Sequence, residues 1–117
     1  MMPFRESKIA VLGDEDLVRG LRLAGVKTYH IIKEDSESRE EAKKILDEMF
    51  DDPYVGVIIV QENHMEFLGS TVEKFRKRGK LTPLVLEVPS KQGIKYADIT
   101  EYYKKYVRDF IGFEIEI

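Results

Sequence analysis

The sequence predicts an α/β domain in which a four-stranded parallel sheet, in the order 2-1-3-4, carries helices on both faces. Two observations support this prediction. Short apolar runs of strand length alternate with longer segments in which apolar residues recur every three or four positions. Residues typical of helix caps and turns separate these segments. Because the alternation is strict, right-handed crossovers should place the strands parallel, with helices above and below them.

The first strand is predicted over residues 8–13, since its apolar run is continuous, as in a strand buried on both faces. Asp14 is placed to cap the next helix through its side-chain oxygen. Glu15 and Asp16 fall in the first turn, where the helix dipole favours negative charge. The chain therefore reads as a strand, a turn and an acidic helix start.

The buried face of this first helix is predicted from apolar residues at helical spacing, namely Leu17, Leu21 and Ala24. Gly25 is placed to end the helix in a left-handed conformation. Residues 26–32 are rich in β-branched and aromatic side chains and are predicted to form the second strand.

Ser38 and Glu41 match the Ser-x-x-Glu capping box and predict the start of a second helix. Its buried face is expected to consist of Ala42, Ile45, Leu46, Met49 and Phe50. Pro53 should end this helix, because the residue before a proline disfavours helical geometry. Residues 54–61 then form the most apolar strand, which is predicted to be central.

A third helix is predicted from the spacing of Met65, Leu68, Val72 and Phe75. The basic run 76–78 and Gly79 should end it. A fourth strand is expected over residues 82–88, with Pro83 at its beginning, where a strand tolerates proline. Asp98 and Glu101 can cap a last helix.

Length and composition indicate one globular unit. The chain has 117 residues, 43% hydrophobic and 35% charged, with a net charge of −3. We expect an α/β domain over residues 1–96, followed by a helix and tail over 97–117. The absence of cysteine excludes disulfides and thiol chemistry, and no apolar run is long enough to span a membrane. Without a signal-peptide pattern, the protein is expected to be cytoplasmic, and the weakly acidic balance gives no reason to bind nucleic acid.

The acids after the first strand raise the question of a phosphoryl site. In a response-regulator receiver domain, acids at this place hold a metal ion, and an acid at the end of the middle strand accepts phosphate. Here that position is Gln61, whose neutral amide cannot form an acyl phosphate. Glu62 follows, but the alternation of a strand points it elsewhere. We therefore expect Asp14 to act as a cap and to bind no metal.

Other signals for catalysis or cofactor binding are weak. No dinucleotide-binding or Walker-type glycine pattern occurs, so no cofactor is expected. His30 and His64 lack second ligands at metal spacing and are interpreted as structural or surface residues. Lys91 follows the fourth strand and could form an ion pair with Asp14 or Asp16. We predict no catalytic or metal-binding residue.

Charge is unevenly distributed along the chain. Residues 33–52 hold nine acidic and four basic side chains, whereas residues 73–80 hold five basic and one acidic side chain. Solvated helix faces explain both runs. Docking to a charged partner is the alternative, in which such charges steer association.

The last helix is predicted to be an interface, because tyrosine and arginine are favoured where proteins meet. Its candidate contact residues are Tyr102, Tyr103, Lys104, Tyr106, Arg108 and Phe110. Residues 113–117 (Phe-Glu-Ile-Glu-Ile) alternate like a strand that could pair with a sheet edge or another chain.

Several motifs together resemble the F subunit of the rotary V-type and archaeal A-type ATPases. They are Gly-Asp-Glu-Asp at 13–16, Gly-Leu-Arg-Leu-Ala-Gly-Val at 20–26, Val-Gly-Val-Ile-Ile-Val at 55–60, Pro-Leu-Val-Leu-Glu-Val-Pro-Ser-Lys at 83–91 and Ile-Gly-Phe at 111–113. The resemblance covers nearly the whole chain in order. Threonine and phenylalanine are common in the family at the positions of Leu17 and Leu21, and both differences keep the helix amphipathic.

The resemblance implies a receiver-like, Rossmann-like fold and a non-catalytic rotor component of the central stalk. Such a component binds the coiled-coil shaft, formed by the D subunit, beneath the catalytic head and helps couple ATP turnover to ion transport. It contacts the membrane only through the complex. The mobile part in the family is its C-terminal segment, which agrees with the aromatic last helix here. The alternative hypothesis is a stand-alone receiver domain for phosphosignalling.

Overall fold

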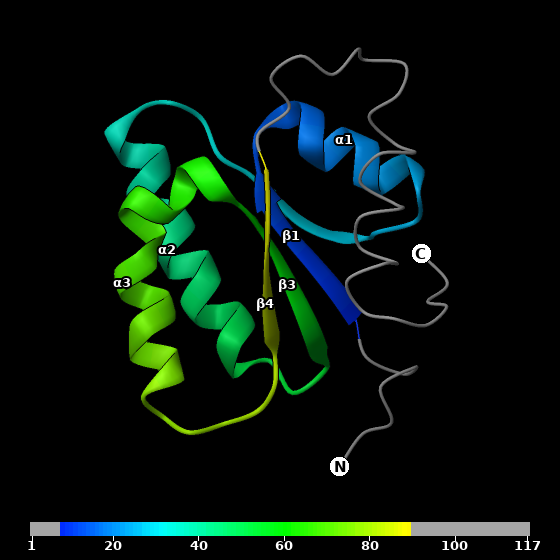
Figure 1. Cartoon of the computed structure of the whole chain (residues 1–117). Coiled ribbons are helices and arrows are strands. Elements are labelled where there is room, and N and C mark those ends of the chain that lie inside the picture. Colours follow the sequence, from blue (N-terminus) through cyan, green and yellow to red (C-terminus); the bar gives the residue numbers. More distant parts are fainter. Residues whose placement is uncertain (1–7, 90–117) are drawn as a thin grey trace.

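The computed structural model describes residues 8–89, in which a four-stranded parallel sheet runs in the order β2-β1-β3-β4. The strands are β1 (Lys8–Gly13), β2 (Thr28–Ile31), β3 (Val55–Gln61) and β4 (Leu84–Val88). The helices are α1 (Glu15–Leu23), α2 (Ser36–Asp51) and α3 (Met65–Arg76), and a short 3₁₀ turn, η2 (Glu62–His64), precedes α3. Figure 1 shows α2 and α3 together on one face of the sheet and α1 on the other. The predicted fold class and strand order are confirmed.

The predicted last helix, the tail and the boundary between residues 96 and 97 lie outside the described residues. Within residues 8–89, no helix has both the length and the apolar composition needed to cross a bilayer.

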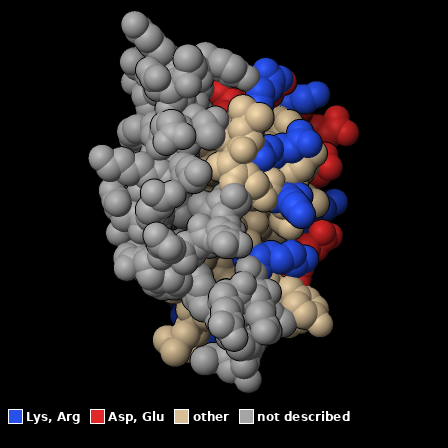
Figure 2. Space-filling model, turned by 90° about the vertical axis from the view of Figure 1, so that its right-hand side faces the viewer, with Lys and Arg blue, Asp and Glu red and all other residues tan. Residues whose placement is uncertain are grey.

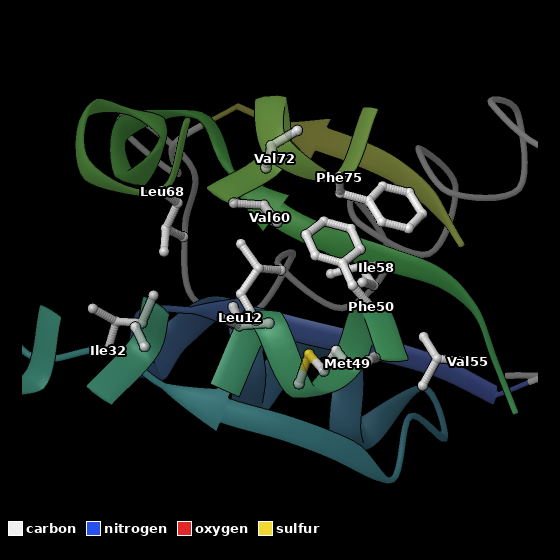
Figure 3. Close-up of a cluster of buried hydrophobic side chains, with 13 residues drawn as sticks. Leu12, Ile32, Met49, Phe50, Val55, Ile58, Val60, Leu68, Val72 and Phe75 are labelled. Atoms are coloured by element: carbon white, nitrogen blue, oxygen red, sulfur yellow. The ribbon is translucent and has the colours of Figure 1, made fainter. Parts of the chain in front are cut away.

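Two apolar layers hold the sheet between its helices. Every residue of the central strand β3 is buried, as its apolar sequence predicts. In the layer beneath α2 and α3, Leu12 and Ile58 of the sheet meet Phe50 of α2 and Phe75 of α3. The two phenylalanine rings stack with their centroids 4.1 Å apart and their planes 8° apart (Figure 3). The aromatic stack therefore joins α2 to α3.

The predicted end of α1 at Gly25 is confirmed. Gly25 has a φ of 112°, which a residue without a Cβ atom adopts at little cost. Its N–H donates to the carbonyl of Arg22, and the N–H of Val26 donates to the carbonyl of Leu21. This pair of bonds is the Schellman motif, which satisfies carbonyl groups left open at the end of a helix.

The predicted capping box at Ser38 and Glu41 is wrong, because α2 begins three residues earlier. Asp35 is the cap, and its Oδ1 accepts a 2.7 Å hydrogen bond from the N–H of Ser38. The Ser38 hydroxyl in turn accepts a 2.8 Å bond from the N–H of Lys33. Ser38 thus occupies the third helical position, and its hydroxyl ties the preceding loop to the helix.

Two strands begin two residues later than predicted. At the start of the expected range 26–32, the N–H of Val26 is used to close α1, so β2 begins at Thr28. At the start of the range 82–88, Pro83 has no N–H to donate to the ladder, and β4 begins at Leu84.

Candidate functional site

The candidate site lies at the carboxyl edge of the sheet, where β1, β3 and β4 end. Leu12 pairs with Val60, and Gln61 pairs with Val88, so the register brings Gly13, Gln61 and Pro89 to one edge. This clustering agrees with the parallel sheet that the sequence predicts. It follows from the parallel sheet, in which all carboxyl ends meet on the same side.

Asp14 and Gln61 form a closed pair of hydrogen bonds at this edge. The Gln61 Oε1 accepts a 2.9 Å bond from the backbone N–H of Asp14, and the Gln61 Nε2 donates a 2.9 Å bond to Asp14 Oδ2. The other carboxylate oxygen, Oδ1, accepts a 2.9 Å bond from the N–H of Leu17 and caps α1. Gln61 itself is 0% exposed. The predicted capping role of Asp14 is confirmed, and its second oxygen holds the end of β3.

Gly13 leaves the space in which this pair is built. A Cβ atom at Gly13 would lie 2.5 Å from the Leu17 Cδ2 and 3.1 Å from the Gln61 Oε1. The first distance is far below a normal carbon–carbon contact of about 3.5–4.0 Å. A Cβ atom would therefore force the buried Leu17 side chain to shift. Glycine is favoured here for close approach, and its backbone conformation is not unusual.

The chemistry of this pair differs from that of a phosphoacceptor. A glutamine amide is neutral and holds the acid through fixed hydrogen bonds, whereas an acyl phosphate needs a free carboxylate nucleophile. Glu62, the nearest other acid in the chain, is exposed on the η2 turn. Among residues 8–89, no group of three or more His, Asp or Glu side chains is placed to hold a metal ion. The arrangement can link two elements of the fold, and the last residue of β3 offers no carboxylate to accept a phosphate.

The charge of Asp14 acts on His64, a relationship that the sequence did not predict. Partial burial lowers the pKa of His64, and the nearby charge of Arg39 lowers it further. The carboxylates of Asp14 and Glu34 act in the opposite direction and raise the pKa. The imidazole ring lies 5.6 Å from the ring of Phe67 at a tilt of 52°, and its buried Nδ1 has no hydrogen-bond partner in the described structure. The charged groups that act on His64, at the start of α3, come from the starts of α1 and α2 and from the β2–α2 loop.

The other residues that the sequence singled out lie away from this edge or outside the described residues. His30 is in the edge strand β2, half-buried, and is not brought to Asp14 as a co-ligand. Part of the charge asymmetry is internal, because Arg78 pairs with Asp51 at 2.8 Å and joins the basic run to the end of α2. Lys91 and the six predicted interface residues lie beyond residue 89.

Comparison with known proteins connects this fold and site to one family. A family model described as the ATP synthase (F/14-kDa) subunit matches residues 9–107. The F subunit of the A-type ATP synthase of Pyrococcus furiosus is 36% identical over 110 residues, which cover 93% of this chain and 98% of the relative. The corresponding protein of Thermococcus kodakarensis is 35% identical over 109 residues, with 93% of this chain and 98% of the relative covered.

A solved structure agrees at the level of the fold. The F subunit of the V-type ATP synthase of Archaeoglobus fulgidus superposes with a TM-score of 0.56 at 21% identity, covering 71% of this chain and 98% of that one. The family model and the two archaeal relatives extend over most of the chain. The chain therefore belongs to the ATP synthase (F/14-kDa) subunit family.

Proposed function

We propose that this chain is a non-catalytic component of the central stalk of a V/A-type ATP synthase, where it helps couple ATP turnover to ion transport. Family membership supports an assembly role. The single structural observation that favours a non-catalytic role is the Asp14–Gln61 pair. It places a buried amide where a receiver-type fold needs an acid, and it occupies both oxygens of Asp14.

In this proposal the α/β body is a rigid support. The Asp14–Gln61 pair joins the end of β3 to the start of α1, and the Phe50–Phe75 stack joins α2 to α3. Rigidity suits a component that must transmit torque, because elements that open easily would absorb it. ATP would bind on other proteins of the complex, and contact with the membrane would occur only through them.

The docking element is proposed to be the aromatic last helix, through Tyr102, Tyr103, Lys104, Tyr106, Arg108 and Phe110. Its partner would be the coiled-coil shaft, formed by the D subunit, near the catalytic head. A stable interface buries about 1,200–2,000 Å² in total, which exceeds what one short helix supplies. A second contact from the body is therefore part of the proposal.

Co-expression with the coiled-coil shaft protein, followed by size-exclusion chromatography, tests the docking role. We expect the full chain to co-elute with the shaft, and a chain truncated after Lys95 to lose most of this binding. A variant with Tyr103→Ala, Tyr106→Ala and Phe110→Ala should behave like the truncated chain. Leu81→Ala is the matched control, since Leu81 is 88% exposed and lies outside that helix. Normal shaft binding and unchanged ATP hydrolysis by a complex containing the truncated chain would contradict the proposal.

The receiver alternative is tested by incubation with acetyl phosphate and magnesium, followed by mass spectrometry of the intact chain. We expect no added phosphate, because the acceptor position holds Gln61. A labile phosphate that is lost in Asp14→Ala would favour the phosphosignalling alternative. Titration calorimetry with magnesium provides a second readout, in which a saturable signal dependent on Asp14 would favour the same alternative.

A further inference from the structure

The outer edge of β2 is an unpaired strand edge within the part of the chain that the structure describes. The sheet order places β2 at one end, next to β1 only. The N–H of Ile32 donates to the carbonyl of Gly13, at the end of β1. Because successive N–H groups of a strand point in opposite directions, the N–H groups of Tyr29 and Ile31 point away from β1. Such an edge is a template for another strand, and natural proteins usually cover or block it.

The surface beside this edge is cationic. Residues 17–33 contain Arg19, Arg22, Lys27 and Lys33 and no acidic residue. Figure 2 looks onto the side of the molecule where α1 ends and shows Lys and Arg side chains gathered in a column, with acidic side chains along its outer border. The cations at Arg22, Lys27 and Lys33 are in no ion pair among residues 8–89. A segment with negative charge would therefore complement this surface.

The same surface carries exposed apolar and aromatic groups. Leu23 is 73% exposed, and Tyr29 is 39% exposed with the Arg22 guanidinium 4.6 Å from the centre of its ring. Tyr29 pairs with Val11 and Ile31 with Gly13, so both side chains lie on the α1 side of the sheet with Arg22. Thr28 and His30 project to the α2 side. The edge thus has a cationic face and a weakly polar face.

We propose that residues 113–117 of this chain, Phe-Glu-Ile-Glu-Ile, form a fifth strand on the outer edge of β2. Successive side chains of a strand point to opposite faces, so Glu114 and Glu116 share one face and the apolar residues share the other. The acidic face then lies on the α1 side with Arg22, and Lys27 is the residue just before β2. The apolar face lies on the α2 side next to Thr28 and His30.

Alternative occupants fit less well. Pairing of two β2 edges from two copies would bring like charges together, which costs free energy. The segment 1–7 (Met-Met-Pro-Phe-Arg-Glu-Ser) contains a proline and a cation and has no alternation. The chain after β4 is long enough to reach β2. The sheet is only about 14 Å wide from β4 to β2, at about 4.8 Å per strand. Between Pro89 and Phe113 there are 23 residues to span this distance.

Amide hydrogen exchange measured by NMR on the full chain tests this proposal. Removal of residues 113–117 should speed exchange of the Tyr29 and Ile31 amides by about tenfold or more. The amides of Thr28 and His30 face β1 and serve as internal controls, which should not change. The double variant Glu114→Lys with Glu116→Lys should have the same effect as the truncation.

Charge reversal provides the specific control. Arg22→Glu with Lys27→Glu should speed exchange in the otherwise unchanged chain, and its combination with the two glutamate-to-lysine changes should restore protection. Lys74→Glu with Lys77→Glu alters the net charge equally at the end of α3 and should leave exchange unchanged. Equal exchange with and without residues 113–117 would overturn the proposal. So would protection that rises with protein concentration, which indicates a second copy, or that requires an added partner.

Discussion

Asp14 and Gln61 lie 47 residues apart in the sequence, and each donates one hydrogen bond to the other and accepts one from it. Their pairing ties the first residue after β1 to the last residue of β3. Because Asp14 also caps α1, one side chain connects two strands and a helix. The edge at which receiver-type folds place their chemistry is here a structural junction.

Gln61→Leu is expected to destabilise the protein by about 1–3 kcal/mol, because it leaves the Asp14 N–H and Oδ2 without their partners at a partly buried position. Urea unfolding followed by circular dichroism measures the change. Asn63→Ala, at an exposed position two residues later, is the control and should change stability by less than about 0.5 kcal/mol. Equal stabilities of the two variants would show that the pair is not a junction.

Gly13→Ala should destabilise the protein by about 1–3 kcal/mol through overpacking, because its Cβ atom would meet Leu17 and Gln61. Gly69→Ala is a matched control: its Cβ has nothing within 4 Å, and it lies within α3, where alanine is the better helix former. We expect Gly69→Ala to be neutral or stabilising in the same thermal or urea measurement. If Gly13→Ala were equally well tolerated, the close packing at this edge would be wrong.

Phe75→Ala should destabilise the protein by about 3–5 kcal/mol, since it removes one ring of the Phe50–Phe75 stack and leaves a cavity. Phe75→Leu keeps most of the apolar volume and should cost less. Leu81→Ala, at an 88% exposed position, should have little effect in the same unfolding experiment. A small effect of Phe75→Ala would indicate that α2 and α3 are held together by other contacts.

His64 predicts a dependence of stability on pH. Burial lowers its pKa in the folded protein below the value in the unfolded chain, so the unfolded chain binds the proton more readily. The destabilising effect of His64 is absent above the pKa that it has in the unfolded chain. The free energy of unfolding falls as the pH decreases from that value towards the pKa of His64 in the folded protein. Unfolding experiments at about pH 7.5 and about pH 5 measure this change. The free energy of unfolding should fall less between these pH values in His64→Gln than in the parent chain. NMR titration of the His64 ring checks the direction of the shift, and an upward shift would contradict it.

Local patterns in the sequence predicted most of the fold. The change from continuous apolar runs to helical spacing located every strand and helix within residues 8–89, and Gly25 marked the end of α1. The capping box at Ser38 failed because Asp35 offers the same signal three residues earlier. The two caps would start the helix three residues apart, and in the structure the N–H of Ser38 is itself bonded to the Asp35 cap.

The sequence by itself determined that the sheet is parallel and that a neutral Gln61 replaces an acid at the end of β3, because both follow from residue type and order. Only the tertiary structure decided that Gln61 bonds to Asp14, that a Cβ atom at Gly13 would meet Leu17 and that the charge of Asp14 acts on His64. These relationships depend on the register between β1 and β3 and on where the helices start above the sheet. Periodicity is a property of neighbours along the chain, and it carries no information on which side chains from distant segments come into contact.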